Sequence, residues 1–200
     1  MTASAPSRAL GRPPATSHAA IEETAFALFE ANGFDATTMD DIATAVGVGR
    51  RTLFRYYPSK NDILWGQFDD GLRSFRDYFA QVPIQTPIAT AIRDAIMEFN
   101  SLDPAATDQH RRRMRFLLQT PALLAHSELR YAAWRRVVAE FVAARLDCTP
   151  DDLLPSLAGR VALAIALSAY EHWLQDATTS LPILIAQASD GLGELLDPIR

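Results

Sequence analysis

The stretch at residues 38–60, TMDDIATAVGVGRRTLFRYYPSK, constrains the fold more than any other part of the chain. Thr38 with Asp41 three positions later is a capping-box pattern, which predicts the start of a helix. Gly47 follows about two turns later, where helices often end in a conformation that glycine tolerates best. A second short helix is predicted over residues 50–57. The stretch therefore predicts two short helices joined by a glycine turn.

The second helix carries side chains that suit DNA recognition. Leu53 and Tyr57 are four residues apart and are expected to face inward, which leaves cations and hydroxyls outward. Arginine can bond guanine in bidentate fashion, threonine can reach base edges, and tyrosine can donate to phosphate. The pattern is that of a helix-turn-helix, whose second helix enters the major groove. The alternative is a solvated basic face on an ordinary helical hairpin. The predicted DNA contacts in this stretch are Thr38, Arg50, Arg51, Thr52, Arg55, Tyr56 and Lys60.

The same stretch resembles the DNA-binding motif of the tetracycline-repressor (TetR) family of bacterial transcription regulators. Phe54 stands where that family usually has tyrosine, so a phosphate contact by that hydroxyl is lost, and Tyr56 and Arg55 are the candidates to replace it. From Arg8 to about Val82 the chain is more closely similar to the TetR-type regulators associated with mycofactocin gene clusters in actinobacteria. The resemblance is carried by Thr37, Thr38, Ile42, Ala43, Gly47, Val48, Thr52, Leu53, Tyr57, Pro58, Ser59 and Lys60, and for the closer group by Trp65, Gly66, Gln67 and Phe68.

The resemblance implies an all-α fold with a three-helix amino-terminal reader and a six-helix body, about nine helices in all. The sequence agrees, because it shows no internal repeat and no strand alternation of useful length. One long helix is predicted over residues 59–82, and an apolar one over 157–174. We expect a flexible basic arm at residues 1–16, a helix-turn-helix DNA-binding domain at 17–60, and a ligand-binding and dimerisation domain at 61–200.

Charge is unevenly distributed along the chain. The formal net charge is -5, which argues against a general nucleic-acid coat protein, and all of it lies in residues 61–200. The segment from Gly47 to Lys60 holds four cations and no acids. Arg12 belongs to the basic arm, which either enters the minor groove of DNA or is a tail without function.

The composition indicates a cytoplasmic protein. The single cysteine, Cys148, excludes an internal disulfide and a cysteine-cluster metal site, and it suits a reducing compartment. The most apolar run, from Val161 to Tyr170, is far short of the ~20 residues that a membrane helix needs. The amino terminus has no apolar segment of a secretory signal. We therefore expect no membrane association.

The body offers an apolar and aromatic set for a small-molecule pocket, although most of these side chains must serve as core. The basic run that follows His110 is either a solvated helix face or an anion site at the mouth of the pocket. The resemblance adds a ligand class, because acyl-coenzyme A thioesters are common ligands of actinobacterial TetR-like regulators. The predicted ligand contacts are Trp65, Phe68, Phe75, Phe99, Met114, Leu117, Trp134, Phe141, Trp173, Arg111 and Arg112.

The leading hypothesis is a ligand-responsive repressor that reads a near-palindromic operator as a homodimer. One short helix contacts too few base pairs for specificity, whereas a dimer places two such helices about 34 to 36 Å apart. The last two helices could meet their copies in a four-helix interface. The first alternative is an architectural or regulatory DNA-binding protein without an inducer. An enzyme is a distant third, because the histidines are isolated and no catalytic or cofactor-binding motif occurs.

Overall fold

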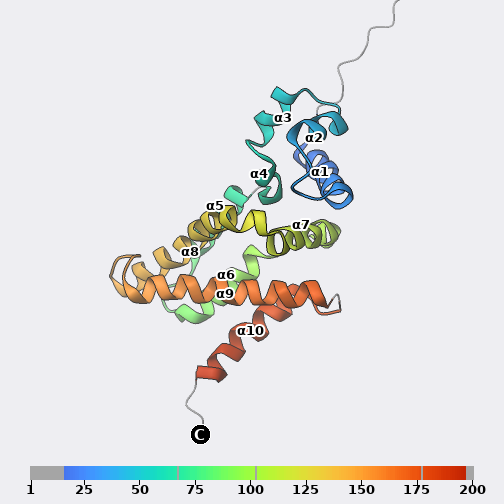
Figure 1. The fold of residues 1–200 in the computed structure, drawn as a ribbon. Helices are drawn as coiled ribbons and strands as arrows, with labels where there is room; N and C mark the ends of the chain where they lie inside the picture. Colours follow the sequence, from blue (N-terminus) through green and yellow to red (C-terminus); the bar gives the residue numbers. More distant parts are fainter. Residues whose placement is uncertain (1–15, 67, 102, 177, 197–200) are drawn as a thin grey trace, which may run out of the picture. The chain divides into compact units, whose positions relative to one another are not determined.

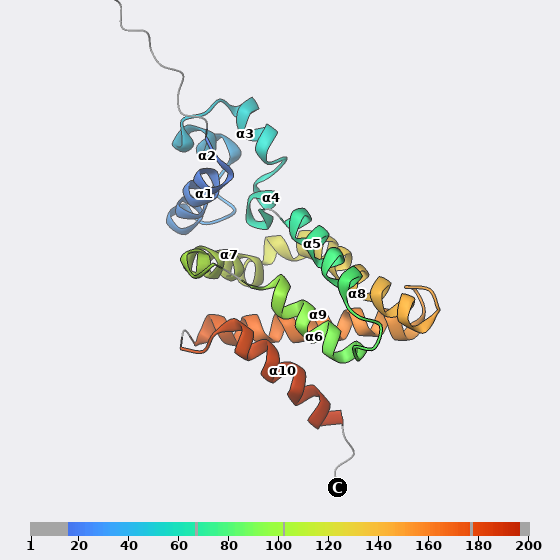
Figure 2. The same cartoon turned by 180° about the vertical axis from the view of Figure 1, so that it is seen from behind.

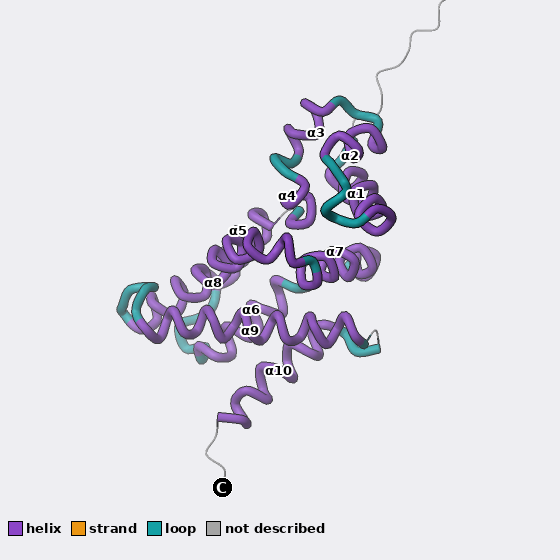
Figure 3. The backbone as a smooth tube through the Cα atoms, in the orientation of Figure 1, coloured by secondary structure: helices purple, strands orange, loops and turns teal. Residues whose placement is uncertain are grey.

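A computed structural model of the chain describes residues 16–66, 68–101, 103–176 and 178–196, and all regular elements in these ranges are helices (Figure 1 and Figure 3). The predicted all-α fold is confirmed. The described ranges contain ten α-helices and two short 3-10 helices, against the nine or so expected. The chain divides into two compact units, Met1–Ser59 and Lys60–Arg200. Each unit is described by itself below.

The first unit contains three helices, of which the second and third form the helix-turn-helix. They are α1 (His18–Asn32), α2 (Met39–Val46) and α3 (Arg50–Tyr56). Their apolar faces meet in a core that excludes water; its central side chains are Ile21, Phe26, Phe29, Ile42 and Leu53.

The local signals of the first unit appear in the structure as the sequence predicts. The Oγ1 atom of Thr38 accepts from the amide of Asp41, and the Asp41 carboxylate accepts from the amide of Thr38, so the capping box is complete. Gly47 ends α2 in the left-handed region at φ 77°. A side chain with a Cβ is strained there, so glycine makes the turn between the two helices possible.

The second unit holds the remaining helices (Figure 1 and Figure 2). In chain order they are α4 (Lys60–Trp65), α5 (Phe68–Gln81), α6 (Ile88–Phe99), η1 (Pro104–Ala106), α7 (Thr107–Gln119), η2 (Pro121–Leu123), α8 (Leu124–Leu146), α9 (Leu153–Gln175) and α10 (Leu181–Leu196). The long helices α8 and α9 pack side by side, and α10 crosses α9. At Gly159 the backbones approach so closely that a Cβ would lie 2.6 Å from the carbonyl oxygen of Arg135.

The single long helix predicted over residues 59–82 is wrong, because the chain breaks at Gly66. That glycine has φ 51°, and its amide donates to the carbonyl of Asp62, 3.1 Å away, which ends α4. Apolar residues continue at spacings of three and four across the break, so periodicity alone does not reveal it. The break separates Trp65, the last residue of α4, from Phe68, the first of α5.

Helix α9 begins four residues earlier than predicted and is buried along one stripe rather than on several sides. Its buried positions follow the helical repeat from Pro155 to Trp173, while Leu153 and Leu154 at its start are exposed. By length and composition α9 could cross a membrane, with a mean hydropathy of 1.5 over an 18-residue window. This is weak evidence, because core helices of soluble proteins have the same length and composition, and α9 packs against α7, α8 and α10.

Candidate functional site

The outer face of α3 presents the predicted DNA-reading side chains. Arg50, Arg51 and Arg55 are exposed, and Thr52 is half-buried. Leu53 is fully buried and Tyr57 is 3% exposed, so the helix turns the predicted face inward. This rotation follows from the four-residue spacing of the two apolar side chains.

Arg50 makes two exposed contacts. Its Nη1 atom lies 3.1 Å from Oδ2 of Asp40, and the two side chains are 67% and 59% exposed. Its guanidinium also lies 5.4 Å from the ring centroid of Phe54. An ion pair this exposed contributes little to stability, so Arg50 can leave Asp40 for a base or phosphate at small cost.

Three other predicted DNA contacts either hydrogen-bond within the reader or lie outside α3. The Tyr56 hydroxyl donates to the carbonyl of Thr16, 2.7 Å away. The Thr38 hydroxyl donates to the Asp41 carboxylate at 2.7 Å and also caps α2. Lys60 is the first residue of α4 in the second unit. Arg12 lies outside the described residues.

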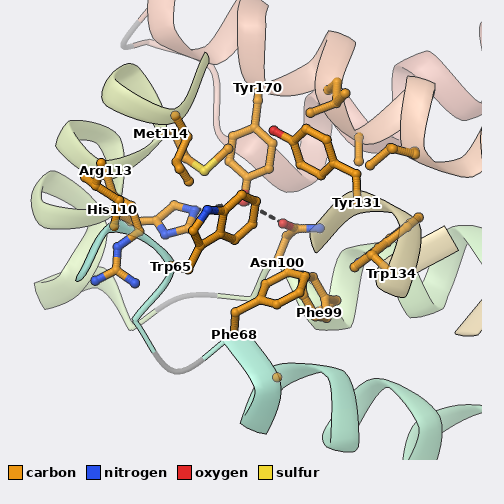
Figure 4. Close-up of a pocket in the computed structure, with 16 residues that line it drawn as sticks. Trp65, Phe68, Phe99, Asn100, His110, Arg113, Met114, Tyr131, Trp134 and Tyr170 are labelled. Carbon is orange, nitrogen blue, oxygen red and sulfur yellow. Dashed lines mark hydrogen bonds between the residues drawn. The ribbon is translucent and has the colours of Figure 1, made fainter. Parts of the chain in front are cut away.

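The second unit contains a cavity of about 310 Å³, shown in Figure 4. Side chains from six helices, α4 to α9, converge on it. Most of the lining is apolar or aromatic, as is usual for small-molecule sites. The lining residues are Leu64, Trp65, Phe68, Gly71, Phe99, Asn100, His110, Arg113, Met114, Leu117, Tyr131, Trp134, Leu163, Ala166, Leu167 and Tyr170.

A chain of hydrogen bonds crosses this lining between three helices. The Tyr170 hydroxyl donates to Oδ1 of Asn100 at 2.5 Å, and the Asn100 amide donates to the carbonyl of Ile96 at 2.7 Å. Nε2 of His110 lies 2.8 Å from the same hydroxyl. Because the single hydroxyl proton is used toward Asn100, Nε2 of His110 must carry a proton and donate. The chain ties α6, α7 and α9 together (Figure 4).

Burial sets the charge state of these groups. The pKa of His110 is lowered to about 4 by burial and by the charge of Arg113, so the imidazole is neutral near pH 7. Burial raises the pKa of Tyr170, and it raises that of Tyr131 to about 12. No Asp or Glu is among the lining residues, and Arg113 is the cation among them. The cavity is therefore apolar with a weakly positive polar part.

Six of the predicted ligand contacts line the cavity and five do not. Phe75 stacks on Trp134 with centroids 5.0 Å apart, and belongs to the core behind the lining. The guanidinium of Arg111 lies 4.0 Å from the ring centroid of Trp173 and donates to its carbonyl. The six in the lining are Trp65, Phe68, Phe99, Met114, Leu117 and Trp134, and the five outside it are Phe75, Phe141, Trp173, Arg111 and Arg112.

The polar part of the cavity is missing from the predicted set. Asn100 lies at the end of α6, His110 opens the basic run, and Tyr170 ends an apolar run. A polar side chain within an apolar helical segment was the available signal for Tyr170, since such groups need a buried partner. Nothing in the spacing connects these residues, which are 60 and 70 positions apart from Tyr170.

Comparison with known proteins matches two parts of the chain to two sequence families. Residues 21–64 match the family described as bacterial regulatory proteins, tetR family. Residues 86–197 match the MftR C-terminal domain. Over 191 residues, 96% of each chain, the sequence is 43% identical to a protein assigned as the mycofactocin biosynthesis transcriptional regulator MftR of Mycobacterium tuberculosis.

Solved structures agree on the fold. FadR of Thermus thermophilus, a TetR-family repressor in complex with lauroyl-CoA, has a TM-score of 0.57 at 20% identity, over 92% of this chain and 96% of that one. FadR of Bacillus subtilis in complex with stearoyl-CoA has a TM-score of 0.58 at 16% identity, over 92% and 100%. The helix-turn-helix, the helical body and the identity along nearly the whole sequence place this chain in the TetR family of bacterial transcriptional regulators, with a C-terminal domain of the MftR type.

Proposed function

We propose that this regulator is a homodimeric repressor that binds a near-palindromic operator and is released when a small, largely apolar inducer occupies the body. The proposal of an inducer rests on the cavity. A body with no ligand to bind would fill a space of about 310 Å³ with side chains, because protein interiors are close-packed. Its volume lies near the lower end of the range of about 300 to 1,000 Å³ for ligand pockets.

On the DNA side, the exposed arginines and Thr52 of α3 are the proposed base and phosphate contacts. The capping box and Gly47 fix the start of α2 and the turn before α3, so the reading helix is presented in one orientation. We propose Thr38 and Tyr56 as weaker phosphate contacts, because their hydroxyls already have hydrogen-bond partners within the unit. We also propose the basic arm with Arg12 as a minor-groove contact.

Dimerisation is supported by the exposed apolar side chains of the last two helices. At the start of α9, Leu153 is 79% exposed and Leu157 is 49% exposed, and on α10 Ile183 is 52% exposed. Exposed apolar side chains of this size on two neighbouring helices are typical of a surface that a second copy covers. Two reading helices in one dimer then match two half-sites.

For the inducer we propose an acyl-coenzyme A thioester, or a smaller molecule with a similar apolar chain. The cavity suits the acyl chain, and the coenzyme part would stay outside it. Arg111 and Arg112 of α7 are the proposed partners of the phosphates. Arg111 would have to leave the face of Trp173 to make such a contact.

The cavity touches both sides of the break at Gly66. Trp65 ends α4, Phe68 begins α5, and both line the cavity. Arg130 of α8 spans the same break, with Nη2 3.1 Å from Asp62 of α4 and Nη1 2.9 Å from Asp69 of α5. We propose that an occupied cavity changes the angle between α4 and α5, and that α4, which directly follows the reader in the chain, carries the change.

The test is an electrophoretic mobility shift on the DNA upstream of the gene, with and without a panel of acyl-coenzyme A thioesters. A shift that one thioester reverses supports both reader and sensor. A shift that no ligand reverses, together with no thermal stabilisation by any ligand, favours the DNA-binding protein without an inducer. The variant Ala166→Leu narrows the cavity, so it should bind DNA normally and lose the response.

The reading residues are tested in the same assay. Arg50→Ala and Thr52→Ala should each weaken operator binding about 10- to 100-fold, with a smaller effect on nonspecific DNA. Arg73→Ala, which removes an exposed arginine from α5, is the matched control for charge and should change little. Equal losses on operator and nonspecific DNA would contradict a base-reading role.

A further inference from the structure

One residue of the cavity lining has a buried hydrogen-bond donor without an acceptor among the described residues. Trp65 is 6% exposed, and among the described residues its indole Nε1 has no hydrogen-bond partner. The ring of Tyr131 meets the Trp65 ring edge to face, with centroids 5.6 Å apart. Figure 4 shows both rings in the lining. Native proteins rarely leave such groups unsatisfied unless a ligand or water completes them.

Two of the acceptors of the lining already accept a hydrogen bond. Oδ1 of Asn100 accepts from Tyr170, and the oxygen of Tyr170 accepts from His110. No carboxylate lines the cavity, and Arg113 can only donate. A ligand that brings a hydrogen-bond donor or a positive charge therefore meets few partners here, whereas one that brings an acceptor meets a free indole N–H.

We propose that the cavity binds an apolar carbonyl compound, a ketone, ester or thioester, whose oxygen accepts a hydrogen bond from Nε1 of Trp65. The proposal rests on the proposed function, in which this cavity is the inducer site, and it adds the chemical group that is recognised. A carbonyl oxygen has two lone pairs, so the Tyr131 hydroxyl can donate to the same atom. The apolar remainder packs on Phe68, Met114 and Leu117.

The position of Trp65 gives this bond a regulatory consequence. Trp65 is the last residue of α4, and Gly66 after it is the left-handed break before α5. A ligand bound to its indole nitrogen is anchored to the end of α4 itself. Contacts to α7 alone would not connect the ligand to α4. Loss of the bond should therefore reduce the response to an inducer more than loss of an apolar contact of equal affinity.

The experiment compares two ligands of the same shape that differ only in the acceptor. Decan-2-one carries a carbonyl, 2-methyldec-1-ene replaces its oxygen by a CH₂ group, and binding of both to the full chain is measured by isothermal titration calorimetry. The wild type should bind the ketone about tenfold more tightly. In Trp65→Phe the ratio should fall to about threefold or less, since the ring remains and the donor is gone. Phe68→Leu should weaken both ligands and keep the tenfold ratio.

The outcomes separate this inference from the function on which it rests. Equal binding of ketone and alkene by the wild type would overturn the hydrogen bond and leave the cavity as a ligand site. A ratio that stays near tenfold in Trp65→Phe would also overturn it. Decanoate, with a carboxylate in place of the ketone, should lose affinity in Trp65→Phe too; strong decanoate binding that the variant leaves unchanged would assign the recognition to Arg113 and contradict the proposal. Binding of none of the three would overturn both the inference and the inducer cavity.

Discussion

The two units of this regulator reach their folds in different ways. In the reader, α1 and α2 are both capped by side chains, Ser17 and Thr38, and end at glycines with positive φ, whereas α3 has no side-chain cap bond. In the body, the first residues of α6, α7, α8 and α9 receive no side-chain cap bond. Helices of the body are therefore stabilised mainly by packing on one another, which is the usual source of helix stability in proteins.

The two units can also be compared by the hydrogen bonds of their buried polar groups. The two buried polar residues of the reader are satisfied: Glu22 accepts from the Tyr57 hydroxyl at 2.7 Å, and the Thr37 hydroxyl donates to the carbonyl of Gly33 at 2.8 Å. The body has its own satisfied chain around Tyr170, but among the described residues Nε1 of Trp65 has no hydrogen-bond partner. Among the described residues the reader also has one buried polar atom without a partner, Nδ1 of His18, but of these two residues only Trp65 lines the cavity.

The largest effect expected is the acid sensitivity of the body through His110. The pKa of this buried imidazole is about 4 against 6.5 for the free side chain. As the pH falls from about 6.5 to 4 the unfolded chain takes up a proton that the folded chain refuses, so stability is lost across that window, by about 3 kcal/mol. His110→Gln keeps a donor toward Tyr170 and does not titrate. Urea unfolding at pH 7 and pH 4 should show a loss smaller by that amount in the variant; equal losses would refute the neutral buried histidine.

The next effect tests the close packing of the body. Gly159→Ala places a Cβ 2.6 Å from the backbone oxygen of Arg135, so α8 and α9 must move apart, at a cost of about 2.5 kcal/mol. Gly193→Ala in α10 meets nothing within 4 Å and is the matched control, neutral or slightly stabilising because alanine favours helix. Thermal unfolding separates the two. If hydrogen exchange showed that Gly159→Ala destabilises only the reader, the close contact between α8 and α9 would not be the cause.

In the reader the largest loss is expected from Tyr57→Phe. The change leaves the Glu22 carboxylate, which is 7% exposed, with one bond fewer, and a buried hydrogen bond to a charged group contributes about 2 kcal/mol. Tyr56→Phe removes a bond to a carbonyl at a half-buried site and should cost less. Hydrogen exchange should show faster opening of α1 and α3 in the first variant; similar rates in the two variants would indicate that the Glu22 bond is not special.

The smallest effect is the local cap. Thr38→Ala removes the side chain that caps α2, which should cost about 1 kcal/mol. Thr44→Ala is the control, because the Thr44 hydroxyl donates to the carbonyl of Asp40 within the same helix and caps nothing. The loss should appear at the start of α2 in hydrogen exchange. If both alanine variants are equally stable, the capping box does not stabilise the start of α2.

The sequence predicts the reader in more detail than the body. The reader was predictable to the residue at α2, because Thr38, Asp41 and Gly47 act on backbone groups a few positions away. The body was predictable as a set of helices, and six of the cavity-lining side chains were named from hydrophobic spacing alone. Phe75 and Phe141 have the same spacing and lie in the core, with Phe141 stacked on Phe79 at 4.4 Å, because spacing gives the face of a helix and not its neighbour.

By itself, then, the sequence determined the class of the fold, the helix-turn-helix with its outward arginines, and the family, since these depend on signals within one helix or turn. The tertiary structure alone decided the break at Gly66 and the meeting of Asn100, His110 and Tyr170 in one chain of hydrogen bonds. It also decided that Trp65 keeps an unpaired donor beside a cavity. The hydrogen-bond chain and the cavity depend on which helices pack together across 60 residues or more, and no periodicity in a single helix records that choice. The break at Gly66 is local, but the apolar periodicity continues across it and hides it.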